Sequence, residues 1–134
     1  MKKGKILVVD DNKGIRDALK ILLGSCFAQV QTIPSPTTLM TTTEEMMPDV
    51  IMLDMNFKTD INTGNEGLYW LSEIKKRWPE MPVVLFTAYA DIALAVEGMK
   101  RGASDFIVKP WDNAKLIETL TSIRDRKDAP KKGT

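Results

Sequence analysis

Short apolar runs alternate with longer amphipathic stretches along this chain, and this alternation restricts the possible folds more than any other feature. A short continuous apolar run is expected for a strand that helices cover on both faces, because both of its sides are then buried. Such strands alternating with helices are typical of βα units, which build a parallel sheet. We therefore predict an α/β fold with a doubly wound, five-stranded parallel sheet and five helices. The apolar runs, predicted to be inner strands or nearly so, are residues 6–9, 50–53, 83–86 and 106–108, and the alternating run 29–33 is predicted at the rim.

Between the predicted strands, apolar residues recur at helical spacing. The strongest pattern covers residues 15–23, and the helix that it predicts ends at Gly24. Ser35 and Pro36 are typical of an N-cap and a first helical turn, so a second helix is expected to begin there and to end before Pro48. Three more helices are predicted around residues 68–78, 92–99 and 116–123.

The amphipathic pattern stops at Arg124, where a charged segment that contains a proline begins. Such a composition is typical of a helix end that frays into a linker. We therefore divide the chain into one domain, residues 1–124, and a charged linker or tail, residues 125–134. The first apolar run has four residues, too short for a secretion signal or a membrane span, so a cytoplasmic protein without membrane contact is expected.

Charge and residue counts exclude several classes of function. The 19 Lys and Arg residues against 18 Asp and Glu residues leave a net charge of +1, so no overall field favours direct binding to nucleic acid. The single cysteine, Cys26, rules out an internal disulfide framework. The chain has no histidine, which excludes Ser-His catalysis and histidine-ligated zinc.

Residues able to do chemistry follow the predicted inner strands directly. Asp10 and Asp11 follow the first strand, Asp54 follows the third, Thr87 the fourth and Lys109 the fifth. The carboxyl ends of parallel strands line one edge of an open α/β sheet, and ligands bind at that edge. We therefore expect these five side chains to lie together.

Three clustered carboxylates either raise a pKa or hold a cation, because they repel one another. Ligands that are all oxygen favour a hard ion such as Mg²⁺, which commonly takes a phosphate oxygen as a further ligand. A lysine and a hydroxyl at the same place, here Lys109 and Thr87, stabilise a phosphoryl group in transfer. Asp54 is the best candidate for the nucleophile, so the predicted product is an aspartyl phosphate.

These motifs, in this order and spacing, resemble the receiver domain of bacterial two-component response regulators, and the resemblance covers the chain from Lys5 to about Arg124. Residues 91–103 are similar to receivers of sigma-factor-activating transcription regulators, in which AAA+ and DNA-binding domains follow the receiver. The motifs that carry the resemblance are Val-Val-Asp10-Asp11-Asn12, Met-Leu-Asp54, Phe-Thr87-Ala88-Tyr89 and Asp105-Phe106-Ile107-Val108-Lys109-Pro110.

The resemblance implies a flavodoxin-like strand order 2-1-3-4-5 and a metal and phosphoryl site. Asp10, Asp11, Asp54 and the backbone carbonyl of Asn56 would bind Mg²⁺. Asp54 would accept a phosphoryl group from a phosphohistidine on a sensor histidine kinase or a phosphotransfer protein. Lys109 would pair with the phosphoryl group, and its bond to the following proline would be cis.

The resemblance also implies a switch. Thr87 and Phe106 would move on phosphorylation and remodel the surface of the fourth helix, fifth strand and fifth helix. The change would either form a homodimer through the fourth and fifth helices or release an inhibited output domain. Asn56 and Tyr89 would influence hydrolysis of the aspartyl phosphate. Such a domain promotes its own phosphorylation and dephosphorylation and is not an enzyme that turns over an external substrate.

Other interpretations of the same residues remain open at this stage. Taken alone, Asp10, Asp11 and the following Asn fit an N-cap cluster for the first helix and nothing more. A magnesium-dependent phosphatase of the haloacid dehalogenase type would need an aspartate where Asn56 stands, and a flavin or nucleotide carrier would need a Gly-rich loop after the first strand. The stretch from Phe57 to Glu66 is longer than in most receivers and lacks their proline, which keeps a pseudo-receiver that binds partners without phosphorylation as the main alternative.

Overall fold

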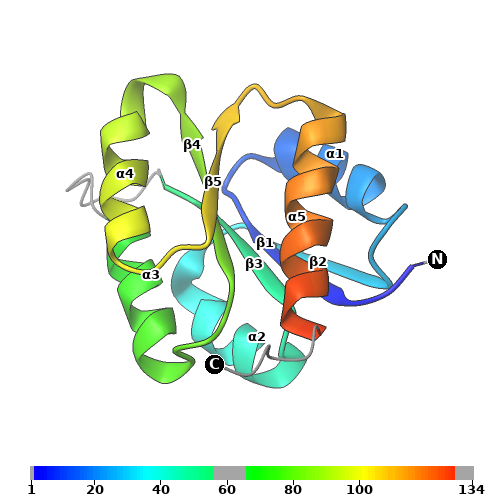
Figure 1. The fold of residues 1–134 in the computed structure, drawn as a ribbon, viewed down its shortest axis with the longest axis horizontal. Coiled ribbons are helices and arrows are strands. Elements are labelled where there is room, and N and C mark those ends of the chain that lie inside the picture. Colours follow the sequence, from blue (N-terminus) through cyan, green and yellow to red (C-terminus); the bar gives the residue numbers. More distant parts are fainter. Residues whose placement is uncertain (1, 56–65, 129–134) are drawn as a thin grey trace.

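The computed structural model describes residues 2–55 and 66–128 and has five parallel strands in one sheet. The strand order is β2-β1-β3-β4-β5, so the predicted doubly wound topology is confirmed (Figure 1). Every neighbouring pair of strands is parallel. The strands are β1 (Lys5–Val9), β2 (Gln29–Ile33), β3 (Val50–Asp54), β4 (Val83–Ala88) and β5 (Asp105–Lys109).

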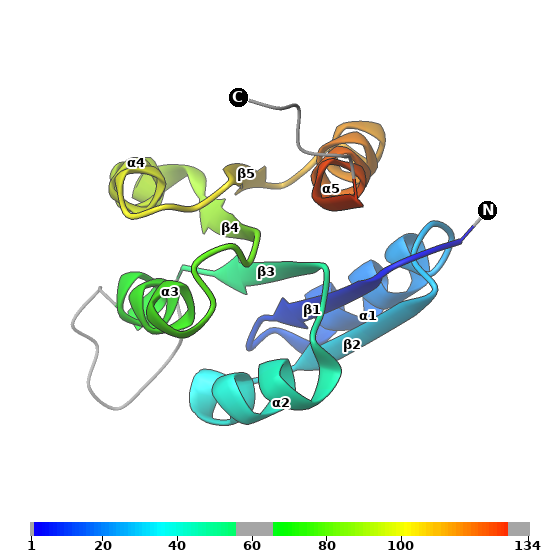
Figure 2. The same ribbon diagram turned by 60° about the horizontal axis from the view of Figure 1, so that its bottom comes forward.

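Helices cover both faces of the sheet. Figure 2 shows α1 and α5 on one face and α2, α3 and α4 on the other. Each face has its own cluster of buried apolar side chains, because successive residues of a strand point to opposite sides. The helices are α1 (Lys13–Leu23), α2 (Leu39–Met46), α3 (Glu66–Arg77), α4 (Ile92–Lys100) and α5 (Asn113–Asp128).

The two edges of the sheet differ in how well the sequence predicts them. β2 lies at one edge, as its alternating pattern indicated. β5 lies at the other edge, and all of its residues are half-buried although residues 106–108 form a continuous apolar run. The apolar run alone suggested an inner strand or nearly so, whereas the strand order 2-1-3-4-5 implied by the family resemblance placed it at this edge, and that order is confirmed. An edge strand has a neighbour on one side only, so its side chains lose the cover that a second strand gives.

Local capping signals explain both ends of α1. Asn12 caps α1 by accepting a hydrogen bond from the backbone N–H of Ile15 at 3.0 Å, and the helix stops at Gly24 as predicted. The start of the second helix differs from the prediction, since Ser35 and Pro36 open a short 3₁₀ turn and α2 begins only at Leu39.

Arg124 lies inside α5, where the sequence analysis expected the helix to fray. The helix continues to Asp128, and Arg124 is 7% exposed. Its guanidinium donates to the carbonyl oxygens of Lys3 at 3.1 Å and Cys26 at 2.7 Å and lies 5.0 Å from the centre of the Phe27 ring. A charged side chain at the expected point of fraying instead ties α5 to the N-terminal segment and to the segment that follows α1.

We expect Arg124→Ala to lower the free energy of unfolding by about 2 kcal/mol, because two carbonyl oxygens lose a charged donor. The control is Arg126→Ala, which removes an exposed arginine from the same helix and should change stability by less than about 0.5 kcal/mol. Urea denaturation of both variants measures the difference. Equal stability of the two variants would contradict the anchoring role.

Candidate functional site

The predicted site residues lie where four strands end at one edge of the sheet. Asp10 follows β1, Asp54 is the last residue of β3, Thr87 is near the end of β4, and Lys109 is the last residue of β5. The registers of the strand pairs bring these ends together, with Asp54 opposite Phe86 and Ala88 opposite Lys109.

Three carboxylates form the centre of this edge. Oxygen atoms of Asp10, Asp11 and Asp54 all lie within 4.8 Å of one another. Asp10 and Asp54 are buried, at 0% and 3% exposed, and Asp11 is half-buried. Their donor atoms are all carboxylate oxygens, which suits a hard divalent cation better than zinc or copper.

The backbone around Asp10 fixes the direction of its carboxylate. One carboxylate oxygen, Oδ1, accepts a hydrogen bond from the backbone N–H of Asn12 at 2.8 Å. The guanidinium of Arg16, one turn into α1, donates to the backbone carbonyl of Asp10 at 2.9 Å. Asn12 therefore caps α1, whereas Asp10 and Asp11 belong to the carboxylate cluster, so the capping residue and the carboxylates are different residues of one segment.

The Lys109 ammonium lies between two of the three carboxylates. Its Nζ is 3.0 Å from Asp10 Oδ2 and 3.3 Å from Asp54 Oδ1. The side chain is 22% exposed, so the pairs are screened less than surface ion pairs. Three carboxylates and one ammonium leave two negative formal charges, a balance that a divalent cation neutralises.

The Thr87 side chain is buried at the same edge, but its hydroxyl is turned toward the segment that leads into α4. It donates to the carbonyl oxygens of Ala88 at 3.3 Å and Asp91 at 3.4 Å. Thr87 thus lies at the edge of the sheet where the carboxylates gather, but its hydroxyl is bonded to the 3₁₀ turn at Tyr89–Asp91 instead.

The remaining predicted residues lie at different distances from the carboxylates. Phe106 is half-buried in β5 and packs against the core cluster on the side of α3 and α4. Tyr89 is 78% exposed at the start of the 3₁₀ turn. Asn56 lies outside the described residues. The bond between Lys109 and Pro110 is cis, as the family resemblance implied.

Two aromatic residues near the site were not assigned to it from the sequence. Nζ of Lys109 lies 4.6 Å from the centre of the Phe86 ring, and Phe86 meets the Trp111 ring nearly at a right angle. An apolar strand residue and a tryptophan in a loop are ordinary core residues by pattern. One sequence signal was available: side chains alternate along β4, so Phe86 points to the sheet face opposite to Thr87, the face covered by α1 and α5.

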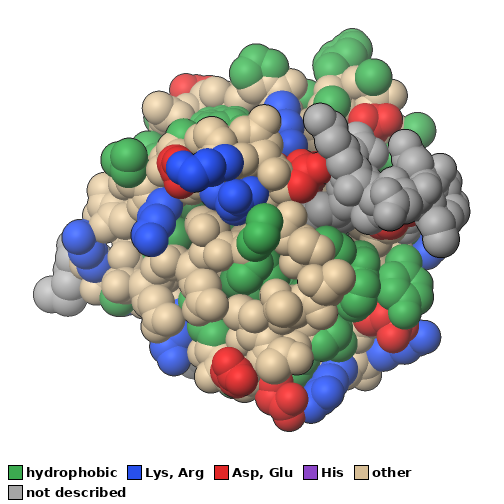
Figure 3. Space-filling model, turned by 180° about the vertical axis from the view of Figure 1, so that it is seen from behind, with side chains coloured by type: hydrophobic (Ala, Val, Ile, Leu, Met, Phe, Trp, Pro, Cys, Tyr) green, Lys and Arg blue, Asp and Glu red, His purple; other side chains and the backbone are tan. Residues whose placement is uncertain are grey.

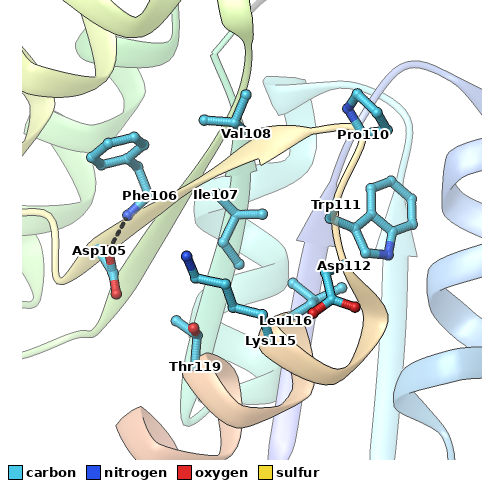
Figure 4. A pocket seen from close by; sticks show the side chains of 10 residues that line it. All are labelled: Asp105, Phe106, Ile107, Val108, Pro110, Trp111, Asp112, Lys115, Leu116 and Thr119. Atoms are coloured by element: carbon cyan, nitrogen blue, oxygen red, sulfur yellow. Dashed lines mark hydrogen bonds between the residues drawn. The ribbon is translucent and has the colours of Figure 1, made fainter.

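A groove of about 500 Å³ lies between β5 and α5. Figure 4 shows that its lining comes from both elements, with Phe106 and Ile107 on the strand and Lys115 and Thr119 on the helix. The groove is beside the fifth strand, within the surface that the sequence analysis predicted to change on phosphorylation.

On the face shown in Figure 3, the basic and acidic side chains of the described residues lie interspersed among uncharged atoms. This agrees with the net charge of +1. Across residues 2–55 and 66–128, no helix is both long and apolar enough to cross a membrane.

The family model for the response regulator receiver domain matches residues 6–121. The chain belongs to this family. The match includes every element from β1 to most of α5, and with it all the strand-end residues described above. Receiver domains are signalling modules, and this chain is one of them.

Solved receiver structures agree with the fold. The signal receiver domain of a two-component response regulator from Bacteroides fragilis is 55% identical, with a TM-score of 0.83, and the match covers 92% of this chain and 98% of that chain. NtrX from Brucella abortus is 30% identical, with a TM-score of 0.81, over 94% of this chain and 27% of that chain.

The curated relatives are longer proteins. The DNA-binding transcriptional regulator NtrC of Salmonella typhimurium is 32% identical over 98% of this receiver, which spans 28% of NtrC. The transcriptional regulatory protein FixJ of Bradyrhizobium diazoefficiens is 30% identical over 96% of this receiver, which spans 61% of FixJ. The receiver therefore corresponds to a part of each of these relatives.

Proposed function

We propose that this receiver is switched by transfer of a phosphoryl group to Asp54 in a site that also holds Mg²⁺. The observation that carries the proposal is the cluster of three carboxylate side chains within 4.8 Å of one another, with the Lys109 ammonium between two of them. Neither the acids alone nor the lysine alone would distinguish this site from a capped helix end or a surface ion pair.

The donor set fits Mg²⁺. Asp10, Asp11 and Asp54 supply carboxylate oxygens, and the backbone carbonyl of Asn56, outside the described residues, is the further proposed ligand. The ion would neutralise the site and stabilise negative charge on the oxygens of a phosphoryl group. This accounts for a cluster of buried acids that is otherwise unfavourable.

Asp54 is the proposed nucleophile because its carboxylate ends the buried strand β3 within the cluster of acids and lies 3.3 Å from Lys109 Nζ. An oxygen of Asp54 forms a bond to phosphorus, the bond between phosphorus and the imidazole nitrogen of the donor breaks, and the imidazole leaves with the electron pair. The Lys109 ammonium stabilises the charge of the phosphoryl oxygens. The donor histidine belongs to a sensor histidine kinase or phosphotransfer protein, since this chain has none.

The response to phosphorylation begins with Thr87. Its hydroxyl is bonded to the carbonyl oxygens of Ala88 and Asp91, and turning toward the phosphoryl group would release the turn before α4. Phe106 would then move inward, and Tyr89 and Asn56 would affect hydrolysis. The exposed apolar residues Val96 and Met99 on α4 and the groove beside α5 support this surface as the contact for a homodimer.

The proposed output is transcription, through an AAA+ or DNA-binding domain C-terminal to the receiver. This is supported by the printed functions of NtrC and FixJ, both transcriptional regulators of which the receiver spans only a part. The proposed division into a receiver at residues 1–124 and a linker at residues 125–134 is modified by α5, which continues into the linker as far as Asp128.

The test is intact-mass measurement after incubation of the purified protein with acetyl phosphate. We expect a gain of one phosphate in the presence of Mg²⁺ and no gain when the metal is chelated. Sedimentation velocity on the same samples tests whether phosphorylation produces the homodimer. No mass gain with a folded protein that binds Mg²⁺ would overturn the proposed phosphorylation and favour a pseudo-receiver that acts by binding alone.

A further inference from the structure

The Lys109 ammonium has a third neighbour besides its two carboxylates, the face of an aromatic ring. Nζ lies 4.6 Å from the centre of the Phe86 ring. Phe86 is 1% exposed and belongs to the core cluster on the side of α1 and α5. The face of a phenyl ring carries partial negative charge, so it attracts an ammonium group, and more strongly where water is excluded.

Trp111 packs against this ring. The two ring centres are 5.2 Å apart and the planes meet at 88°, a favourable arrangement for an aromatic pair. The Trp111 indole N–H donates to the side-chain oxygen of Asn113, the first residue of α5, at 2.8 Å. Trp111 lies on the segment between β5 and α5 (Figure 4). The ring pair is thus fixed by the core on one side and by the start of α5 on the other.

We propose that the Phe86 ring, held by Trp111, positions the Lys109 ammonium beside Asp54 for phosphoryl transfer. The inference rests on the proposed function and adds two positioning residues to it. Lysine has a flexible four-carbon stem, and the carboxylates of Asp10 and Asp54 hold its end at 3.0 and 3.3 Å. A divalent cation weakens that hold by neutralising the carboxylates. The attraction of the ring is independent of the metal, so it keeps the ammonium at the site.

The test compares substitutions that remove or keep an aromatic ring. Phe86→Leu removes the ring that faces the ammonium but keeps an apolar side chain. Trp111→Leu removes the support of that ring, and Trp111→Phe keeps an aromatic neighbour. We expect the rate of phosphorylation by acetyl phosphate at saturating Mg²⁺ to fall about three- to tenfold in the two leucine variants. This is the change in rate that corresponds to the loss of one cation–π contact. Trp111→Phe should retain a rate close to that of the wild type.

The matched control is Phe27→Leu. Phe27 is also 1% exposed and belongs to the same core cluster, but the cation over its ring is that of Arg124. Its substitution removes a similar volume from the same core, and we expect no change in phosphorylation rate. Thermal unfolding of the variants shows whether the losses of stability are comparable.

A second measurement does not depend on phosphorylation. In protein labelled with ¹³C in its lysines, the ring current of Phe86 should move the methylene protons next to the Lys109 ammonium upfield, and Lys109→Ala identifies the signal. We expect this shift in the presence and absence of Mg²⁺, its loss in Phe86→Leu and its retention in Phe27→Leu.

The outcomes separate this inference from the proposed function. A Lys109 signal and a phosphorylation rate that are the same in Phe86→Leu and Phe27→Leu would overturn the positioning role. If Phe86→Leu does not fold, Trp111→Leu decides the same question. A wild-type protein that takes up no phosphoryl group would overturn the proposed function, and with it the positioning role in transfer, whatever the Lys109 signal shows.

Discussion

Asp54→Asn is expected to take up no phosphoryl group from acetyl phosphate under conditions in which the wild-type protein gains one. An amide has no nucleophilic carboxylate oxygen, so the bond to phosphorus cannot form. The asparagine side chain has nearly the same size and stays at the end of β3, where Asp54 is 3% exposed. Intact-mass measurement over time gives the rate for both proteins.

The control for this substitution is Asp17→Asn. Asp17 is an exposed carboxylate on α1 that pairs with Lys13, and its replacement should leave the mass gain unchanged. Mg²⁺ should also raise the melting temperature of Asp54→Asn less than that of the wild type, because one of three carboxylate ligands is lost. Phosphate incorporation by Asp54→Asn equal to that of Asp17→Asn would place the acceptor elsewhere in the chain.

Lys109→Ala is expected to have opposite effects on metal binding and on phosphorylation. Without the ammonium, the buried carboxylates of Asp10 and Asp54 lose a cation at 3.0 and 3.3 Å, so unfolding without metal should require about 2 kcal/mol less free energy. The same loss removes repulsion against an incoming divalent cation, and the affinity for Mg²⁺ should rise about tenfold. Phosphorylation should nevertheless become much slower, because Lys109 no longer stabilises the phosphoryl oxygens.

These three effects are measured by urea denaturation with and without Mg²⁺, by isothermal titration with Mg²⁺, and by mass. Lys76→Ala is the control. It breaks an exposed ion pair with Glu73, in which the lysine is 76% exposed, and such pairs contribute about 0.2 to 1 kcal/mol. A Mg²⁺ affinity in Lys109→Ala that is equal to or lower than that of the wild type would contradict the electrostatic account of the site.

The site residues were predictable because parallel strands share one direction. Once the apolar runs are assigned as strands of one parallel sheet, the residue after each run must lie at the same edge. This places Asp10, Asp54, Thr87 and Lys109 together before any distance is known. The position of an individual atom does not follow from this rule, and the Thr87 hydroxyl, engaged with the carbonyl oxygen of Asp91, is an example.

The errors of the sequence analysis also have physical causes. Residues 106–108 have the composition typical of an inner strand, and it was the strand order implied by the family resemblance, not the composition, that placed β5 at the edge. Arg124 begins a charged run, and charge favours solvent. Only the folded chain brings the carbonyl oxygens of Lys3 and Cys26 to the same place, where they accept hydrogen bonds from a buried arginine.

The amino-acid sequence by itself determined the number and type of the strands and α-helices and the strand-end residues that meet at one edge of the sheet. Periodicity is a local property, and the alternation of strands with helices indicates a parallel sheet, so the two are sufficient for these conclusions. The tertiary structure decided that the ammonium of Lys109 lies between two buried carboxylates and over the ring of Phe86. Those contacts join residues that are distant in the chain, and their distances depend on how the strands and helices pack.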